Sequence, residues 1–121
     1  RFSEKINFLG KELNTLLNLL KSQGNIIAGY GAPAKATTLM HHFYIGSDTI
    51  NYIVDDSKWK QGLYTPGTHI PIVPKSYMQQ NQPDYILILA WNFANSIIEN
   101  NSDFKNRGGK FIIPLPQLKI V

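Results

Sequence analysis

A lysine close to two glycines is the first feature of this sequence that could do chemistry. The stretch Ile26–Met40 reads IIAGYGAPAKATTLM, in which a short apolar run leads into Gly29 and Gly31 and then into a segment of helical character. Lys35 falls in the first turn of that predicted helix, beside the positive end of the helix dipole. This placement costs roughly 0.3–1 kcal/mol unless an anion lies nearby. A phosphate bound at the turn would offset that cost.

The spacing of the small residues indicates the same kind of ligand. Gly29, Gly31 and Ala34 match the G-x-G-x-x-A form of the dinucleotide-binding fingerprint. In that fingerprint the first glycine permits a tight turn, the second lets a phosphate approach the backbone, and the last small residue keeps the helix close to the strand. The alternative is a plain glycine turn with Lys35 in solvent. An acidic pair that begins at Asp55, about 20 residues further on, favours the phosphate interpretation.

Other polar and aromatic side chains are expected near the same turn. Asp55 follows the second predicted strand and can accept the hydroxyl groups of a ribose, but it can equally cap the loop that follows. Tyr30, Trp59 and Tyr64 can stack on a base or a sugar, although an aromatic residue in a loop more often anchors the loop.

The histidines and remaining carboxylates predict neither a metal site nor a catalytic group. His41 and His42 are adjacent, so they point about 100° apart on a helix. His69 has no nearby partner in the sequence, and Glu99 and Asp103 share one predicted helix face that is expected to be solvated. The chain has no cysteine, which excludes thiolate ligands and a cysteine nucleophile. We expect a binding site without catalytic residues.

The composition fits one globular domain that binds a small anion. The chain has 121 residues, 43% of them hydrophobic and 17% charged, and a formal charge of +4 that is scattered along the sequence. Scattered basic residues argue against nucleic acid as the partner. No apolar run approaches the ~20 residues of a membrane span, and no signal peptide is evident. We expect a cytoplasmic protein, and we interpret the start at Arg1 as that of a piece of a longer chain.

The apolar spacing predicts alternating helices and strands. Helices are predicted over residues 2–23, from Pro33 to near Gly46, around 75–80, and from an Asn92 cap through Phe93 and Ile97 towards Phe104. Strands are predicted over 26–29, 50–56, 70–73 (at an edge), 84–90 and 110–116, with a short sixth strand at the end. The segment 57–69 is predicted to be a long functional loop.

This order predicts a Rossmann-like three-layer α/β/α domain with a mostly parallel sheet of five or six strands, preceded by an N-terminal helix. Right-handed crossovers would place the first and fourth strands side by side at the switch point. The carboxyl ends of the strands would then bring Gly29–Lys35, Asp55–Asp56 and Trp91–Asn92 to one crevice.

Five ordered blocks of the sequence also resemble a known family. They read GYGAPAK (29–35), YIVDD (52–56), KQGLYTPGTHIPI (60–72), DYILILAWNFA (84–94) and GGKFIIPLP (108–116). They resemble the C-terminal domain of SAM-dependent C-methyltransferases, whose characterised members act on nucleotide-linked deoxysugars. The resemblance begins at residue 25, so we expect a joining helix over 1–24 and the Rossmann-like domain over 25–121.

The resemblance implies a larger enzyme. A small zinc-binding domain and a central S-adenosylmethionine-binding domain would precede this one, so both cofactors would belong to upstream domains and neither to this chain. The implied partners are a nucleotide-diphosphate sugar and the upstream SAM-binding domain, with no nucleic acid and no membrane. In the intact enzyme a proton beside a sugar carbonyl would be removed, and the enolate carbon would then attack the methyl group of SAM.

The resemblance also implies the residues of the site. The loop that faces a phosphate would comprise Gly31, Ala32, Pro33, Ala34 and Lys35. Gly29, Tyr30 and Thr38, which keeps a hydroxyl at the matching position, are further expected substrate-binding residues. The cleft would be lined by Asp55, Asp56, Gln61, Tyr64, Thr65, His69, Trp91, Asn92 and Phe93. One departure stands out, because the family commonly reads Gly-Asn-Thr where this chain has Ala36, Thr37 and Thr38. We expect the added Cβ of Ala36 and the loss of a side-chain amide at Thr37 to narrow the site or change its ligand.

Two other functions fit the same residues. The glycine pattern and Asp55 suit a nicotinamide dinucleotide domain of an oxidoreductase, although Lys35 would crowd its loop and Pro33 removes an amide donor. A non-catalytic interaction domain that keeps the fold and has lost its ligand is the third interpretation.

Overall fold

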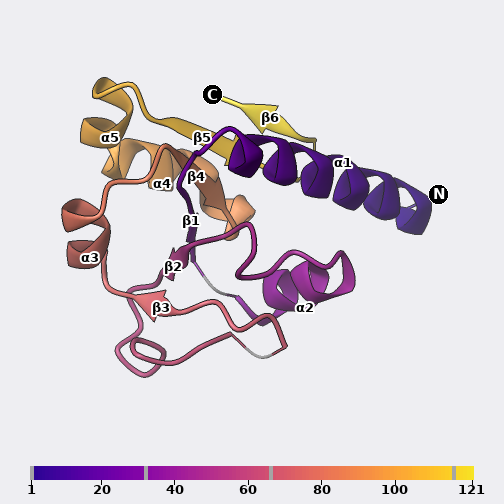
Figure 1. The fold of residues 1–121 in the computed structure, drawn as a ribbon, viewed down its shortest axis with the longest axis horizontal. Coiled ribbons are helices and arrows are strands. Elements are labelled where there is room, and N and C mark those ends of the chain that lie inside the picture. Colours follow the sequence, from indigo (N-terminus) through magenta and orange to yellow (C-terminus); the bar gives the residue numbers. More distant parts are fainter. Residues whose placement is uncertain (1, 32, 66, 116) are drawn as a thin grey trace.

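The computed structural model describes residues 2–31, 33–65, 67–115 and 117–121. Its strands form one sheet in the order β3-β2-β1-β4-β5-β6 (Figure 1). Their bounds are β1 Ile27–Tyr30, β2 Tyr52–Val54, β3 Ile72–Val73, β4 Tyr85–Ile88, β5 Lys110–Ile113 and β6 Lys119–Ile120. The first five run parallel, and β6 pairs antiparallel with β5. The mostly parallel α/β sheet expected from the sequence is confirmed.

The strand that precedes the glycine turn lies at the centre of the sheet. Ala28 pairs in register with Tyr52 of β2 on one side and with Ile86 of β4 on the other. The expected pairing of the first and fourth strands is therefore confirmed. Because the chain order reverses between β1 and β4, the carboxyl ends of these strands form the switch point at which open α/β sheets bind ligands.

Helices cover both faces of the sheet. Their bounds are α1 Phe2–Ser22, α2 Ala34–His42, α3 Lys75–Gln80, η1 Trp91–Phe93 (a 3₁₀ turn), α4 Ala94–Asn100 and α5 Ser102–Asn106. Leu17 of α1 and Met40 of α2 share one buried cluster with alternate strand residues such as Ile53. The other strand face packs against α3, α4 and α5. The side chains of successive strand residues thus point to opposite faces of the sheet, as the pleat of a strand requires.

The first helix is part of this packing. Leu13, Leu17 and Leu20 of α1 belong to the same buried cluster as the central strands. The side chain of Asn14 also donates a hydrogen bond to the carbonyl oxygen of Phe43, 2.6 Å away, where α2 ends. The N-terminal end of α1 extends past the sheet in Figure 1. No helix among the described residues is long and apolar enough to cross a membrane.

The expected helix that starts from an Asn92 cap is wrong in its details. Asn92 lies inside the 3₁₀ turn η1, and the residue before α4 is Phe93, which makes no side-chain cap. The helix is also interrupted at Asn101, whose buried side-chain amide donates to the carbonyl oxygen of Ile97 at 2.7 Å. An asparagine side chain competes in this way with the backbone hydrogen bonds of a helix.

The described residues of the long loop over 57–69 form no helix, as expected, but some of them pair regularly with the β3 segment. The Gly62 N–H donates to the Ile72 carbonyl, and the Ile72 N–H donates to the Leu63 carbonyl, both at 2.9 Å. Tyr64 forms an isolated antiparallel bridge with Pro71. The loop therefore covers the outer edge of β3, which is the edge strand that the sequence predicted.

Candidate ligand-binding site

The turn after β1 depends on one glycine more than on the other. Gly31 has φ of 84°, and a Cβ on it would lie 2.9 Å from the Cβ of Ala90. Its N–H donates to the carbonyl oxygen of Val54 at 2.7 Å. A Cβ on Gly29 would instead lie 2.9 Å from a side-chain carbon of Ile53. Gly31 therefore permits the turn, and Gly29, to which the sequence interpretation assigned that task, permits close packing.

The start of α2 has no capping side chain. Pro33, expected in the first turn of the helix, precedes it in an extended conformation with φ −67° and ψ 145°. Its carbonyl oxygen accepts the N–H groups of Ala36 and Thr37 at 3.0 and 3.1 Å. The earlier amides of Ala34 and Lys35 have no acceptor inside the helix. The first turn contains no acidic residue. These amides can therefore receive an anion.

Lys35 is exposed in this first turn. Its ammonium group forms no ion pair with any residue that the structure describes. An unpaired cation beside uncapped amides favours an anion more than either feature does alone. Ala32, which the sequence placed in the same loop, lies outside the described residues. Thr38 is exposed three residues further along α2.

Asp55 makes several contacts within its own loop. One carboxylate oxygen accepts the N–H of Ser57 at 2.8 Å, and the other lies 3.8 Å from the ammonium nitrogen of Lys60. The side-chain amide of Gln61 donates to the backbone carbonyl of Asp55 at 2.8 Å. These contacts fit the loop-capping alternative for Asp55. Asp56, the second acidic residue of the pair, is exposed.

The second half of the loop is also held together internally. Thr65 is 1% exposed, and its hydroxyl pairs with that of Thr68 and accepts the N–H of Ile70 at 3.0 Å. His69 is exposed and has φ of 56°, in the left-handed region that non-glycine residues seldom adopt. Tyr64 is exposed as well. Thr65 was expected to line the cleft, but its side chain is buried and its hydroxyl already has hydrogen-bond partners within the loop.

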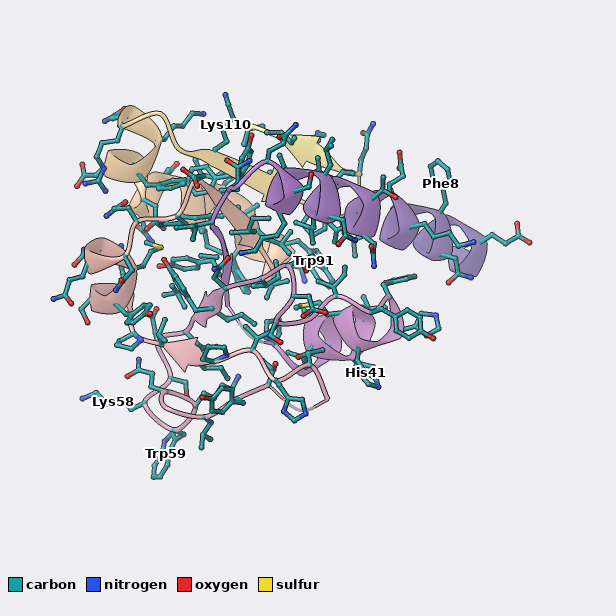
Figure 2. All side chains as sticks on the ribbon, viewed as in Figure 1. Phe8, His41, Lys58, Trp59, Trp91 and Lys110 are labelled. Carbon is teal, nitrogen blue, oxygen red and sulfur yellow. The ribbon has the colours of Figure 1, made fainter. Side chains whose placement is uncertain are left out.

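The exposed tryptophan of the loop lies apart from the other one. Trp59 is 91% exposed, and Figure 2 shows it beside Lys58 at the outer end of the loop. Trp91 is half-buried against the cluster beneath α1 and α2. Tyr30 packs on the opposite face of the sheet, against the cluster beneath α3, α4 and α5. The aromatic residues around the edge therefore do not form one stacking platform.

The residues directly after β4 are divided between core and solvent. Trp91 lines a small cavity, whereas Asn92 and Phe93 are exposed. Asn92 and Phe93 thus follow the same switch point as Gly31 and can contact a ligand there. Their roles stay predictions.

Ala36 corrects one expectation about the site. It is 1% exposed and belongs to the buried cluster beneath α1 and α2. Its Cβ therefore faces the core, and the expected narrowing of the phosphate loop is wrong. Ala36 lines the same cavity as Trp91, together with Leu39 and Leu115. The sequence interpretation overlooked this cavity, since apolar spacing marks such residues only as core.

The described residues show no cluster of metal ligands, and the tyrosine whose pKa shifts lies away from the glycine turn. No group of three His, Cys, Asp or Glu among them could hold a metal ion. Burial raises the pKa of Tyr52 well above its usual range, with a smaller contribution from Tyr77. The Tyr52 hydroxyl donates to the carbonyl oxygen of Asn81 at 2.6 Å. This tyrosine starts β2, at the opposite end of the strands from the glycine turn.

Comparison with known proteins identifies the family. Residues 1–116 match the family described as the C-methyltransferase C-terminal domain. One similar protein is the C-methyltransferase NovU of Streptomyces niveus, which is 36% identical over 110 residues, or 91% of this chain. The aligned region covers 26% of that protein, so the chain spans about a quarter of its length. The match over nearly the whole chain shows that the chain belongs to the C-methyltransferase C-terminal domain family.

Proposed function

We propose that this domain binds a nucleotide-diphosphate sugar for a SAM-dependent C-methyltransferase whose methyl-transfer site lies in another domain. The observation that carries the proposal is Lys35, exposed and without an ion pair among the described residues, in the uncapped first turn of α2 at the switch point. Family membership supports the type of enzyme. The S-adenosylmethionine and zinc of the upstream domains, and the cytoplasmic location, stay expectations.

The role of this domain would be to position the diphosphate. The amides of Ala34 and Lys35 and the Lys35 ammonium group would hold its oxygens through charge-assisted hydrogen bonds. Each bond of this kind contributes about 1.5–3 kcal/mol. Proton removal from the sugar would belong to residues of another domain, since the turn and the first helical residues over 29–38 contain no carboxylate and no histidine.

An oxidoreductase that binds a nicotinamide dinucleotide is the first alternative. Its domain would use the acidic residue after β2 to accept the ribose hydroxyls. Here the carboxylate of Asp55 already accepts the Ser57 N–H and lies near Lys60. Pro33 also lacks the amide that this loop would otherwise offer. The third interpretation, an interaction domain without a ligand, leaves the uncapped start of α2 unexplained.

A calorimetric titration of this chain with UDP-glucose, dTDP-glucose, NAD and S-adenosylmethionine tests the proposal. We expect a sugar nucleotide to bind most tightly, and Lys35→Ala to weaken it by about 1.5–3 kcal/mol. Lys110→Ala is the matched control, because Lys110 is also exposed but starts β5, at the amino end of the strands and away from the turn (Figure 2). A preference for NAD would support the oxidoreductase. Binding of none of the four would support the interaction domain.

A further inference from the structure

A polar groove lies between α1 and the residues that end α2. Its volume is about 660 Å³. The residues that α1 contributes to it recur at helical spacing and form one stripe along the helix; they are Asn7, Gly10, Lys11, Asn14 and Thr15. The stripe is about 12 Å long, at ~1.5 Å per helical residue. A groove of this length accommodates about four residues of an extended chain at ~3.3 Å each.

Tyr44 forms part of the other wall, in a conformation that favours glycine. Its φ is 59°, in the left-handed region. Its N–H donates to the His41 carbonyl oxygen at 3.2 Å, and the Ile45 N–H donates to that of Met40 at 2.9 Å. This is the hydrogen-bond pattern that commonly places a glycine after a helix. The Tyr44 side chain is 92% exposed, so burial of its ring does not offset the backbone cost.

A strained residue with an exposed aromatic ring indicates binding more than folding. Non-glycine residues in sparsely populated backbone conformations cluster at ligand and switch sites. Tyrosine is also enriched at protein interfaces, where its ring supplies contact area and its hydroxyl supplies a hydrogen bond. Tyr44 has both properties and borders the groove.

The two walls of the groove are joined through Phe43. Gly10 of α1 packs so closely on the Phe43 ring that a Cβ would lie 2.3 Å from it. The Asn14 side chain donates to the Phe43 carbonyl oxygen at 2.6 Å. The rings of His42 and Phe43 pack edge to face, with their centroids 5.0 Å apart. These contacts hold the groove in shape, and a preformed groove avoids the entropic cost of ordering its walls on binding.

The charge of the groove favours an acidic partner. Lys11 is exposed in the stripe of α1, and His42 is exposed on the opposite wall. The described residues that line the groove include no carboxylate. The Asn7 amide and the hydroxyls of Thr15 and Tyr44 add groups that can donate to a carboxylate or to a backbone carbonyl.

We propose that this groove binds an extended acidic segment of a partner protein. A carboxylate of the segment would pair with Lys11, and one of its side chains would pack on the Tyr44 ring. The site is separate from the proposed phosphate turn, because Lys35 lies in the first turn of α2 and Tyr44 follows the last turn. The proposal therefore does not depend on a sugar nucleotide.

Fluorescence anisotropy on this chain with two labelled peptides tests the charge preference. The acidic probe is Gly-Glu-Glu-Phe-Glu-Glu-Gly, and the control probe carries lysine in place of each glutamate. We expect the acidic probe to bind roughly 10-fold more tightly at low salt, since opposite charges attract and like charges repel across an interface. Equal binding of the two probes, or no binding of the acidic one, would overturn the proposal.

Tyr44→Gly separates a binding role from a structural one. We expect it to weaken the acidic probe about 5-fold or more, as loss of an aromatic anchor does. It should also raise Tm by roughly 2–5 °C, because glycine relieves the left-handed conformation. Tyr64→Ala is the control, since Tyr64 is 63% exposed and does not line the groove. Unchanged affinity in Tyr44→Gly would contradict the proposal.

The lysine is tested in the same way. Lys11→Gln should weaken the acidic probe about 3-fold or more and reduce the salt dependence of its binding. Lys105→Gln is the control, because Lys105 is also exposed on a helix but lies on α5, outside the groove. Equal effects of the two substitutions would show non-specific attraction and overturn the proposal.

Two further measurements fix the occupant and the independence of the site. Analytical ultracentrifugation tests for a second copy: a dimer that Tyr44→Gly disrupts would assign the groove to that copy instead. Calorimetry with sugar nucleotides should give the same affinities for Tyr44→Gly, Lys11→Gln and the unmodified chain. A loss there comparable to that of Lys35→Ala would place the groove within the nucleotide site and overturn the proposal of a separate one.

Discussion

The turn after β1 and the loop over 57–69 both follow the carboxyl ends of central strands, yet they use their polar groups in opposite ways. In the turn, the first amides of α2 are uncapped and Lys35 has no ion pair among the described residues. In the loop and directly before it, Gln61, Thr65 and Asp55 form hydrogen bonds with neighbouring residues. Polar groups that have no partner in the folded chain are therefore the ones available to a ligand.

Substitution of Gly31 in the turn is expected to have the largest effect on stability, and Gly62 in the loop provides the comparison. Gly31→Ala should lower the free energy of unfolding by about 2–4 kcal/mol, since it adds the left-handed cost of ~1–2 kcal/mol to overpacking against Ala90. Gly62→Ala in the loop has a similar φ of 86° but open space around its Cβ. Gly62→Ala should therefore cost only the ~1–2 kcal/mol of the left-handed conformation. Urea denaturation of both variants measures the difference, and equal losses would contradict the close packing of the turn.

Removing the buried loop hydroxyl should lower stability without affecting the ligand. Thr65→Val leaves the Ile70 N–H and the Thr68 hydroxyl without their partner and should cost about 1–3 kcal/mol. Thr65→Ser, which keeps the hydroxyl, is the control. The readouts are urea denaturation and the affinity for a sugar nucleotide. A loss of affinity larger than that of Lys35→Ala would show that this loop, rather than the turn, holds the ligand.

Asp55 allows a finer test of the same comparison. Asp55→Ala removes the acceptor of the Ser57 N–H and the partner of Lys60, and should cost about 1 kcal/mol of stability. Asp56→Ala should change stability little, because Asp56 is exposed. Thermal denaturation measures both. If Asp55→Ala instead left stability unchanged and abolished nucleotide binding, the result would show that Asp55 binds the ribose.

Tyr52, at the start of β2 and away from the carboxyl ends of the strands, should affect only stability. Its pKa is raised in the folded chain, so the unfolded chain loses the phenol proton first as pH rises. Stability is therefore present in full below pH ~10, the usual tyrosine pKa, and falls above it. Tyr52→Phe should cost about 0.5–1 kcal/mol at neutral pH and flatten that decline. Urea midpoints between pH 7 and pH 11 provide the test, and an unchanged decline in the variant would point to another group.

The order of most elements and the place of the glycine turn could be predicted from the residues alone. Apolar spacing marked α1, the buried strand β4 and the edge strand β3, because burial of one face requires that spacing. The glycine pattern placed the turn before α2, because the left-handed conformation of Gly31 favours glycine. Lys35 was evident for the same reason, since its position relative to the helix start depends only on local sequence.

The tertiary structure alone decided which side chains remain available. Asp55 and Thr65 are polar in the sequence, but their partners come from loop residues whose positions depend on how 57–69 folds back along β3. Ala36 and Trp91 are close to the turn in the sequence, yet they line a cavity whose other wall is α1. Hydrogen bonds and packing between distant segments set these environments, and a local pattern of residue types does not contain them.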